Sequence, residues 1–209
     1  MPILYATVLI DLIGFGIVIP ILPFLSPQLG ADKFDIALII VTYAAAAGLV
    51  GPMWGRLSDR LGRKPVIMIC LAGAALSYVL LGLASQLWMI YLARGFAGLM
   101  AGNFGVASAM MADITPPKDR ARGMGILGSA FGIGLVIGPV MGGLLSTDNS
   151  FTLPCIVAGA MSLLALLATM LGLLQSLTAA ARSAPESVAA VVEEFSAAMD
   201  NIATTKKPS

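Results

Sequence analysis

Gly55-Arg-Leu-Ser-Asp-Arg-Leu-Gly-Arg-Lys-Pro-Val66 is the most highly charged stretch of a chain that is otherwise almost entirely apolar. It carries four cations and one anion, and it separates two long hydrophobic runs. Of the 209 residues, 58% are hydrophobic and 11% are charged, whereas soluble domains carry about 25% charged residues. We therefore expect this charged stretch to be a short loop at the surface of a lipid bilayer that both flanking runs cross.

Six apolar runs are long enough to cross a bilayer, because a spanning helix needs about 20 residues. They predict an all-α membrane protein whose residues 1–175 form a bundle of six transmembrane helices. The two triplets of runs have similar spacing, which is typical of the three-helix repeats of secondary transporters. The expected spans cover about residues 3–25, 35–54, 65–84, 87–112, 122–145 and 151–174.

The cations indicate which side of the membrane each connection faces. Ten of the twelve Lys and Arg residues follow the second, fourth or sixth run, and only Lys33 lies on the opposite side. Cytoplasmic segments carry such an excess of Lys and Arg. We therefore expect both termini to be cytoplasmic.

The composition becomes polar and Ala-rich in residues 176–209, which we expect to form a cytoplasmic tail. Ser183-Ala-Pro-Glu186 matches a capping box with Pro in the first turn, and apolar residues then recur at helical spacing. An amphipathic helix is predicted over about residues 184–202. Its acidic face would be repelled by anionic lipid, so two roles stay open: resting loosely on the membrane, or docking to a partner protein.

Composition excludes several functions. The chain contains no His, so imidazole metal sites and Ser-His-Asp triads are ruled out, and no other catalytic constellation is present. We expect no enzyme activity, no cofactor and no metal. A net charge of +1 gives no indication of a nucleic-acid partner.

Two ionisable residues, Asp11 and Arg94, fall inside expected spans. A charge at the bilayer centre costs about 2.5–3.5 kcal/mol, so such groups usually face a polar interior. Their depths differ by about 5–10 Å, which permits a direct or water-bridged pair if the first and fourth helices adjoin. They form either a proton or substrate site or a structural ion pair. Asp11 is the only intramembrane carboxylate, and so the only acidic candidate for carrying a proton.

Glycine and proline mark two spans. Proline kinks a helix and glycine allows close approach, so the first span is expected to be a broken helix that lines a cavity, with Gly14, Gly16, Pro20 and Pro23 as its kink. Small residues four apart reduce one face of the fifth span to backbone, where a neighbouring helix can pack closely. They are Ala130, Gly134, Gly138 and Gly142, with Pro139 and Gly143 beside them.

Four stretches resemble motifs of the major facilitator superfamily, in the family's order, and the resemblance covers about residues 3–175. The charged stretch resembles the signature between its second and third helices, through Gly55, Asp59, Arg60, Gly62, Arg63 and Lys64. Arg94-x-x-x-Gly98 resembles the fourth-helix motif, and Gly134-x-x-x-Gly138-Pro139-x-x-Gly142-Gly143 resembles the fifth-helix motif of antiporters. Asp11-x-x-Gly14-x-Gly16-x-x-x-Pro20-x-x-Pro23 resembles the first helix of drug/proton antiporters, and the tetracycline/proton antiporters are the most similar group.

This resemblance implies alternating-access export of a small amphiphilic, tetracycline-like drug, driven by proton entry across a bacterial inner membrane. It implies that Asp11 and Arg94 belong to the proton and substrate pathway. It also implies a gate in which Arg63 pairs with Asp113 and Asp59 clamps a helix end of the second half of the transporter.

The chain also departs from that family. The family has twelve or more helices, whereas only six are expected here. Its tetracycline exporters place a carboxylate where Ser77 precedes Tyr78, and a polar residue where Ala47 stands. Two hypotheses follow: a half-size transporter completed by a homodimer or another six-helix protein, or a transport-inactive accessory subunit of a larger membrane complex.

Overall fold

The structure, a computed structural model, describes residues 2–146 and 151–172. The predicted amphipathic helix and the rest of the tail lie outside these residues. Contacts within the chain separate a unit Met1–Met170 from Leu171–Ser209.

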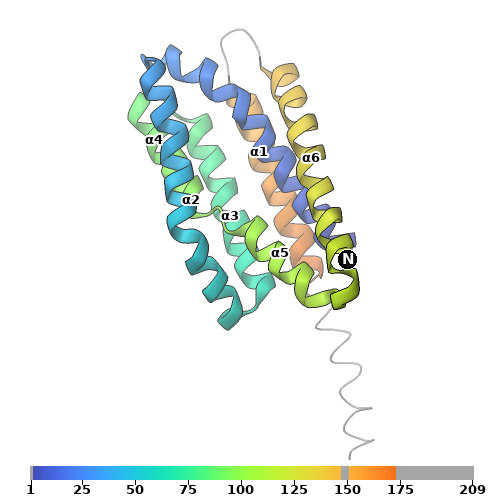
Figure 1. Ribbon diagram of the computed structural model, residues 1–209. Coiled ribbons are helices and arrows are strands. Elements are labelled where there is room, and N and C mark those ends of the chain that lie inside the picture. The colour runs from blue at the N-terminus through green and yellow to red at the C-terminus, as the bar shows by residue number, and fades with distance from the viewer. Residues whose placement is uncertain (1, 147–150, 173–209) are drawn as a thin grey trace, which may run out of the picture. The chain divides into compact units, whose positions relative to one another are not determined.

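Helices make up almost all of the described chain, and six of its segments are long and apolar enough to span a membrane, as predicted. The fourth span comprises α4 and α5, and the fifth comprises the 3₁₀ helix η1 and α6 (Figure 1). The sixth span is the helix Thr152–Gly172. The labelled elements are α1 (Pro2–Gln28), α2 (Lys33–Leu61), α3 (Arg63–Gly82), α4 (Leu87–Leu99), α5 (Asn103–Ile114), η1 (Pro117–Asp119) and α6 (Arg120–Leu145).

The expected loop over residues 55–66 is wrong. Helix α2 continues to Leu61 and α3 begins at Arg63, so that Gly62 alone links them. Arg, Leu and Ser can all be accommodated in a helix. The charged residues of this stretch therefore extend α2 beyond the apolar run and do not end it. The turn is made at Gly62, whose φ of +93° is a left-handed conformation that glycine adopts readily.

The fourth span is present close to its expected bounds, at Leu87–Ile114, but residues 100–102 interrupt its helix between α4 and α5. Trp54 of α2 lies against this break, and its indole Nε1 donates to the carbonyl oxygen of Leu99 over 2.7 Å. A Cβ on Gly102 would lie 2.5 Å from Cγ of Trp54, so a larger residue would push the indole away. This break was not predicted, because the stretch around it is mostly apolar and carries no charged residue.

Helices α1 and α6 pack backbone to backbone, side by side in Figure 1. A Cβ on Gly138 would lie 2.5 Å from Cα of Gly16, and one on Gly142 would lie 2.6 Å from the carbonyl oxygen of Ile17. The close packing predicted from these small residues is therefore present, with α1 as the partner. Gly143 does not take part, since a Cβ there would meet nothing within 4 Å.

The first span is not interrupted, because α1 is helical throughout Pro2–Gln28 with Pro20 and Pro23 inside it, and the kink expected at these prolines stays a prediction. Its C-terminal part leans toward the start of α2 in Figure 1. The glycines serve as contact points: Gly16 meets α6, and a Cβ on Gly14 would lie 3.1 Å from the carbonyl oxygen of Ala158 in the sixth span. Neighbouring helices can support a proline-containing helix in a membrane.

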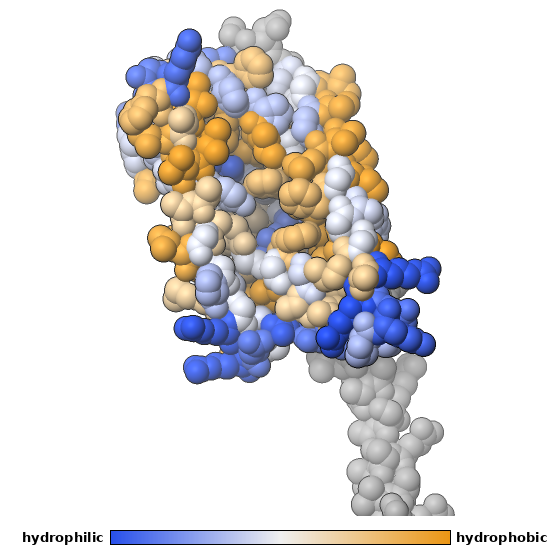
Figure 2. Space-filling view, viewed as in Figure 1, coloured by the Kyte–Doolittle hydropathy of each residue, from blue (hydrophilic) through white to orange (hydrophobic). Residues whose placement is uncertain are grey.

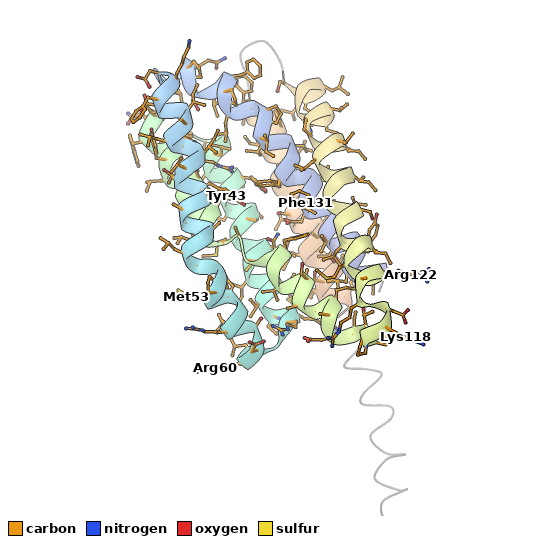
Figure 3. All side chains as sticks on the ribbon, viewed as in Figure 1. Tyr43, Met53, Arg60, Lys118, Arg122 and Phe131 are labelled. Atoms are coloured by element: carbon orange, nitrogen blue, oxygen red, sulfur yellow. The ribbon has the colours of Figure 1, made fainter. Side chains whose placement is uncertain are left out.

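Many large apolar side chains of the bundle are exposed, as a lipid-facing surface requires, and Figure 2 shows apolar residues over much of one face. Leu49 is 77% exposed and Leu144 is 81% exposed. Hydrophilic side chains gather at one end, where Figure 3 labels Arg60, Lys118 and Arg122. This is the end that the distribution of cations predicts to be cytoplasmic.

Candidate functional site

A cavity of about 220 Å³ lies in the middle of the bundle. Figure 2 shows a hollow on this face with hydrophilic colour at its floor, and Figure 3 labels Tyr43 and Phe131 on its two sides. Each of the labelled long helices contributes to its wall. The lining residues include one from each helix in the order α1 to α6: Asp11, Tyr43, Ser77, Arg94, Asn103 and Phe131.

Asp11 is 5% exposed and receives hydrogen bonds from two neutral side chains. The side-chain amide of Asn103 donates to its Oδ2, and the Ser162 hydroxyl donates to its Oδ1 over 2.8 Å. These bonds satisfy a buried carboxylate that would otherwise be costly to hold in the bundle. Because neither partner is a cation, protonation of Asp11 would break no ion pair.

Arg94 is 3% exposed and lies beside an aromatic ring. Its guanidinium carbon is 5.6 Å from the centroid of the Tyr43 ring, which is cation–π geometry. Its Nε and Nη2 are buried and have no hydrogen-bond partner. The two ion pairs found among the described residues do not involve it. The direct Asp11–Arg94 pair that the sequence permitted is therefore absent, and the two charges line one cavity separately.

The third-span wall of the cavity is neutral. Ser77 is fully buried, and its hydroxyl donates to the carbonyl oxygen of Ala74 over 2.7 Å. This satisfies its donor within its own helix. Ala47 does not line the cavity. In residues 2–146 and 151–172, no group of three or more Cys, Asp or Glu could hold a metal ion.

A second polar cluster joins the ends of α2, α3 and α5. Arg63 Nε lies 2.9 Å from Asp113 Oδ2, and its Nη1 lies 2.7 Å from Asp59 Oδ1. The same Nη1 donates to the Ser58 hydroxyl over 2.6 Å, and Ser58 in turn donates to the carbonyl oxygen of Gly55. The pairing of Arg63 with Asp113 implied by the resemblance is confirmed. The role of this cluster as a gate stays a prediction.

Asp59 lies in the last turn of α2, where the negative end of the helix dipole disfavours a carboxylate. The Arg63 guanidinium, four residues on and across the Gly62 turn, offsets the dipole. The Asp59 side chain is still 61% exposed, so a further partner has room to reach it.

Sequence reasoning missed three residues of these sites. Asn103 was identifiable in principle, since it is an amide within an apolar run, but its position in the chain does not show that it meets Asp11. Ser162 and Tyr43 carry no signal of their own, because serine and tyrosine are common in membrane helices. Only the packing of the helices brings them to Asp11 and Arg94.

Comparison with known proteins shows the family of this chain. A family model described as Major Facilitator Superfamily matches residues 4–203. The chain is 43% identical over 161 residues to the class H tetracycline resistance protein of Pasteurella multocida. This match covers 75% of the present chain and 39% of the relative. It is 36% identical over 166 residues to the class B tetracycline resistance protein of Escherichia coli, covering 78% and 41% respectively. The chain thus spans about two fifths of these relatives.

Among solved structures, the human organic anion transporter MFSD10 (TETRAN) is similar to this chain with a TM-score of 0.72 and 25% sequence identity. The match covers 80% of this chain and 45% of the human protein. The six-span bundle therefore has the fold of one half of that larger molecule.

Proposed function

The chain belongs to the major facilitator superfamily, and from this we propose that it is one six-helix half of a proton-coupled exporter of small amphiphilic drugs such as tetracyclines. It is an integral membrane protein with six candidate spans, related to bacterial drug-efflux proteins. Its family is one of transporters, not of enzymes.

The surroundings of Asp11 are the observation that carries the proposal. It is a buried carboxylate at bilayer depth, it lines a cavity, and its partners are neutral donors. Intramembrane carboxylates of this kind serve as proton relays in transporters. We assign the proton to Asp11 and the adjoining cavity to the drug, with Arg94 as the cation of the same pathway.

The open cavity supports the need for a second half. Two charged side chains line a hollow that reaches the surface of the described bundle (Figure 2), and lipid is a poor neighbour for such groups. In transporters built from repeats, sites of this kind lie at the interface between the repeats. The complement is a second copy of this chain or another six-helix membrane protein, and Asp59 of the gate contacts a helix end in it.

The proposed orientation places Arg60, Lys118 and Arg122 at the cytoplasmic face of a bacterial inner membrane. The Arg63 cluster then lies at the cytoplasmic mouth of the transport route, as a gate requires.

Flux in everted membrane vesicles tests the proposal. The chain is produced alone and together with the C-terminal half of the class H tetracycline resistance protein, and co-purification verifies assembly. We expect tetracycline uptake driven by a pH gradient in vesicles that contain a complete assembly, and its loss in Asp11→Asn. Assembled halves without uptake, and no uptake by the native membranes of the source cell, would refute transport.

A second candidate is the accessory subunit, and Ser77 favours it. Ser77 stands where the resembling exporters have an acidic side chain, and its hydroxyl already donates a hydrogen bond to the carbonyl oxygen of Ala74. Mild extraction of native membranes separates the two candidates. An accessory subunit co-purifies with several different proteins in a complex that loses this chain when residues 176–209 are deleted. A lone chain or a homodimer argues against it.

A further inference from the structure

Arg94 carries hydrogen-bonding capacity that nothing in the described chain uses. Its guanidinium lines the central cavity, is 3% exposed, and has no partner for Nε or Nη2. Arginine cannot discharge by losing its proton, and a buried cation normally finds a compensating anion. The missing group is therefore an anion.

Asp11 does not supply that anion. Its Oδ1 and Oδ2 are already bonded to Ser162 and Asn103, which belong to other helices. The Tyr43 ring contributes a π face to the guanidinium, and the Nε and Nη2 donors of Arg94 stay unused. An incoming anion would meet a cation with no competing internal carboxylate.

The cavity around Arg94 is aromatic. Phe15 and Tyr43 have ring centroids 5.6 Å apart, and those of Phe104 and Phe131 are 5.5 Å apart. Members of both pairs line the cavity, and aromatic rings favour offset or tilted contacts with other flat rings. A volume of about 220 Å³ suits a small fused-ring body.

We propose that the cavity contains a binding subsite for an anionic group on an aromatic ligand, with the anion against the Arg94 guanidinium and the ring system between Phe15–Tyr43 and Phe104–Phe131. This inference rests on the proposed function only in treating the cavity as the substrate pathway, and it names the substrate class as aromatic anions. The proton on Asp11 is separate from this subsite, since Asn103 and Ser162 hold that carboxylate.

Equilibrium binding to the full chain in lipid nanodiscs tests the subsite without a pH gradient. The probes are 2-naphthoate, its neutral isostere 2-naphthamide and the cation 2-naphthylmethylammonium, measured by titration calorimetry. We expect naphthoate to bind at least about tenfold more tightly than naphthamide, a difference of about 1.4 kcal/mol, and the cation to bind most weakly.

Three variants locate the anion. Arg94→Gln removes the preference for naphthoate over naphthamide, and Arg94→Lys restores part of it because a cation is kept. Asp11→Asn tightens naphthoate binding, since it removes a negative charge from the cavity wall. If Arg94→Gln abolishes binding of both ligands, the Arg94→Lys result decides: a preference retained there supports the subsite, and none overturns it.

Equal affinities of naphthoate and naphthamide for the wild type, or binding of neither, overturn the subsite. The outcome is independent of the transport assay. A naphthoate preference without tetracycline flux keeps the subsite and removes the exporter, whereas flux without a preference keeps the exporter and removes the subsite.

Discussion

The side-chain amide of Asn103, the first residue of α5, donates a hydrogen bond to the carboxylate of Asp11 in α1. The break over residues 100–102 lies directly before Asn103, so that a new helix begins beside Asp11. A backbone irregularity thus lies directly beside the carboxylate that we assign to proton transfer. Such irregular backbone is tolerated at membrane depth where it is buried in protein or lines a cavity.

We predict that Asn103→Leu destabilises the bundle by about 1.5–3 kcal/mol, the value of a hydrogen bond to a charged group. In an Asp11→Asn background the same substitution costs less, because no carboxylate is left unsatisfied. Unfolding in detergent micelles gives the four values of this double-mutant cycle. Strict additivity would show that the two side chains are not energetically coupled.

We predict that Trp54→Phe lowers the free energy of unfolding by about 0.5–1.5 kcal/mol, the net value of one hydrogen bond. The ring is kept but the donor to the Leu99 carbonyl is lost. The matched control is Trp88→Phe, because Trp88 is exposed and its indole bonds only to neighbouring Gln86. Equal effects of the two substitutions would contradict a special role for Trp54 at the break.

Glycine substitutions in α6 test the α1–α6 contact. Gly138→Ala forces a methyl group into the backbone of Gly16, and we expect a loss of about 1–3 kcal/mol, typical of overpacking. Gly143→Ala on the same helix meets open space and is expected to be neutral or slightly stabilising, as alanine is the better helix former. Thermal unfolding of the two variants side by side measures the difference. A loss as large for Gly143→Ala would show that helix propensity, not packing, governs this helix.

The Arg63 cluster is half-exposed, and its stabilising effect should depend on salt. We expect Asp113→Asn to cost about 0.2–1 kcal/mol at low ionic strength, as exposed ion pairs do, and less at about 1 M salt, where screening acts over about 3 Å. Asp119→Asn, in the nearby helix η1 and outside the two ion pairs of the described chain, is the control. A salt-independent loss for Asp113→Asn would mean that the pair is not electrostatic in origin.

The six spans were predictable because bilayer thickness fixes the length of an apolar run. The α1–α6 contact was predictable in kind, since Gly134, Gly138 and Gly142 leave no other use for that face. Its partner helix was not, because small residues show that something packs closely without showing what.

The errors have a common physical cause. The charged stretch around Gly62 and the apolar run around Gly102 were both assigned from polarity alone, yet helices end where backbone conformation or a competing hydrogen bond requires it. Asp11 and Arg94 were identified correctly as buried charges lining one interior, but their separate partners depend on Asn103, Ser162 and Tyr43. No spacing along the chain brings these residues together.

Proton movement coupled to the drug tests the central claim most directly. Everted vesicles with the co-purified assembly are acidified inside, and a fluorescent pH reporter follows the gradient when tetracycline is added. The account predicts that wild type dissipates the gradient on addition of tetracycline and that Asp11→Asn does not, although Asp11→Asn still assembles and still binds tetracycline. Dissipation by Asp11→Asn equal to that of the wild type would contradict the assignment of the proton to Asp11.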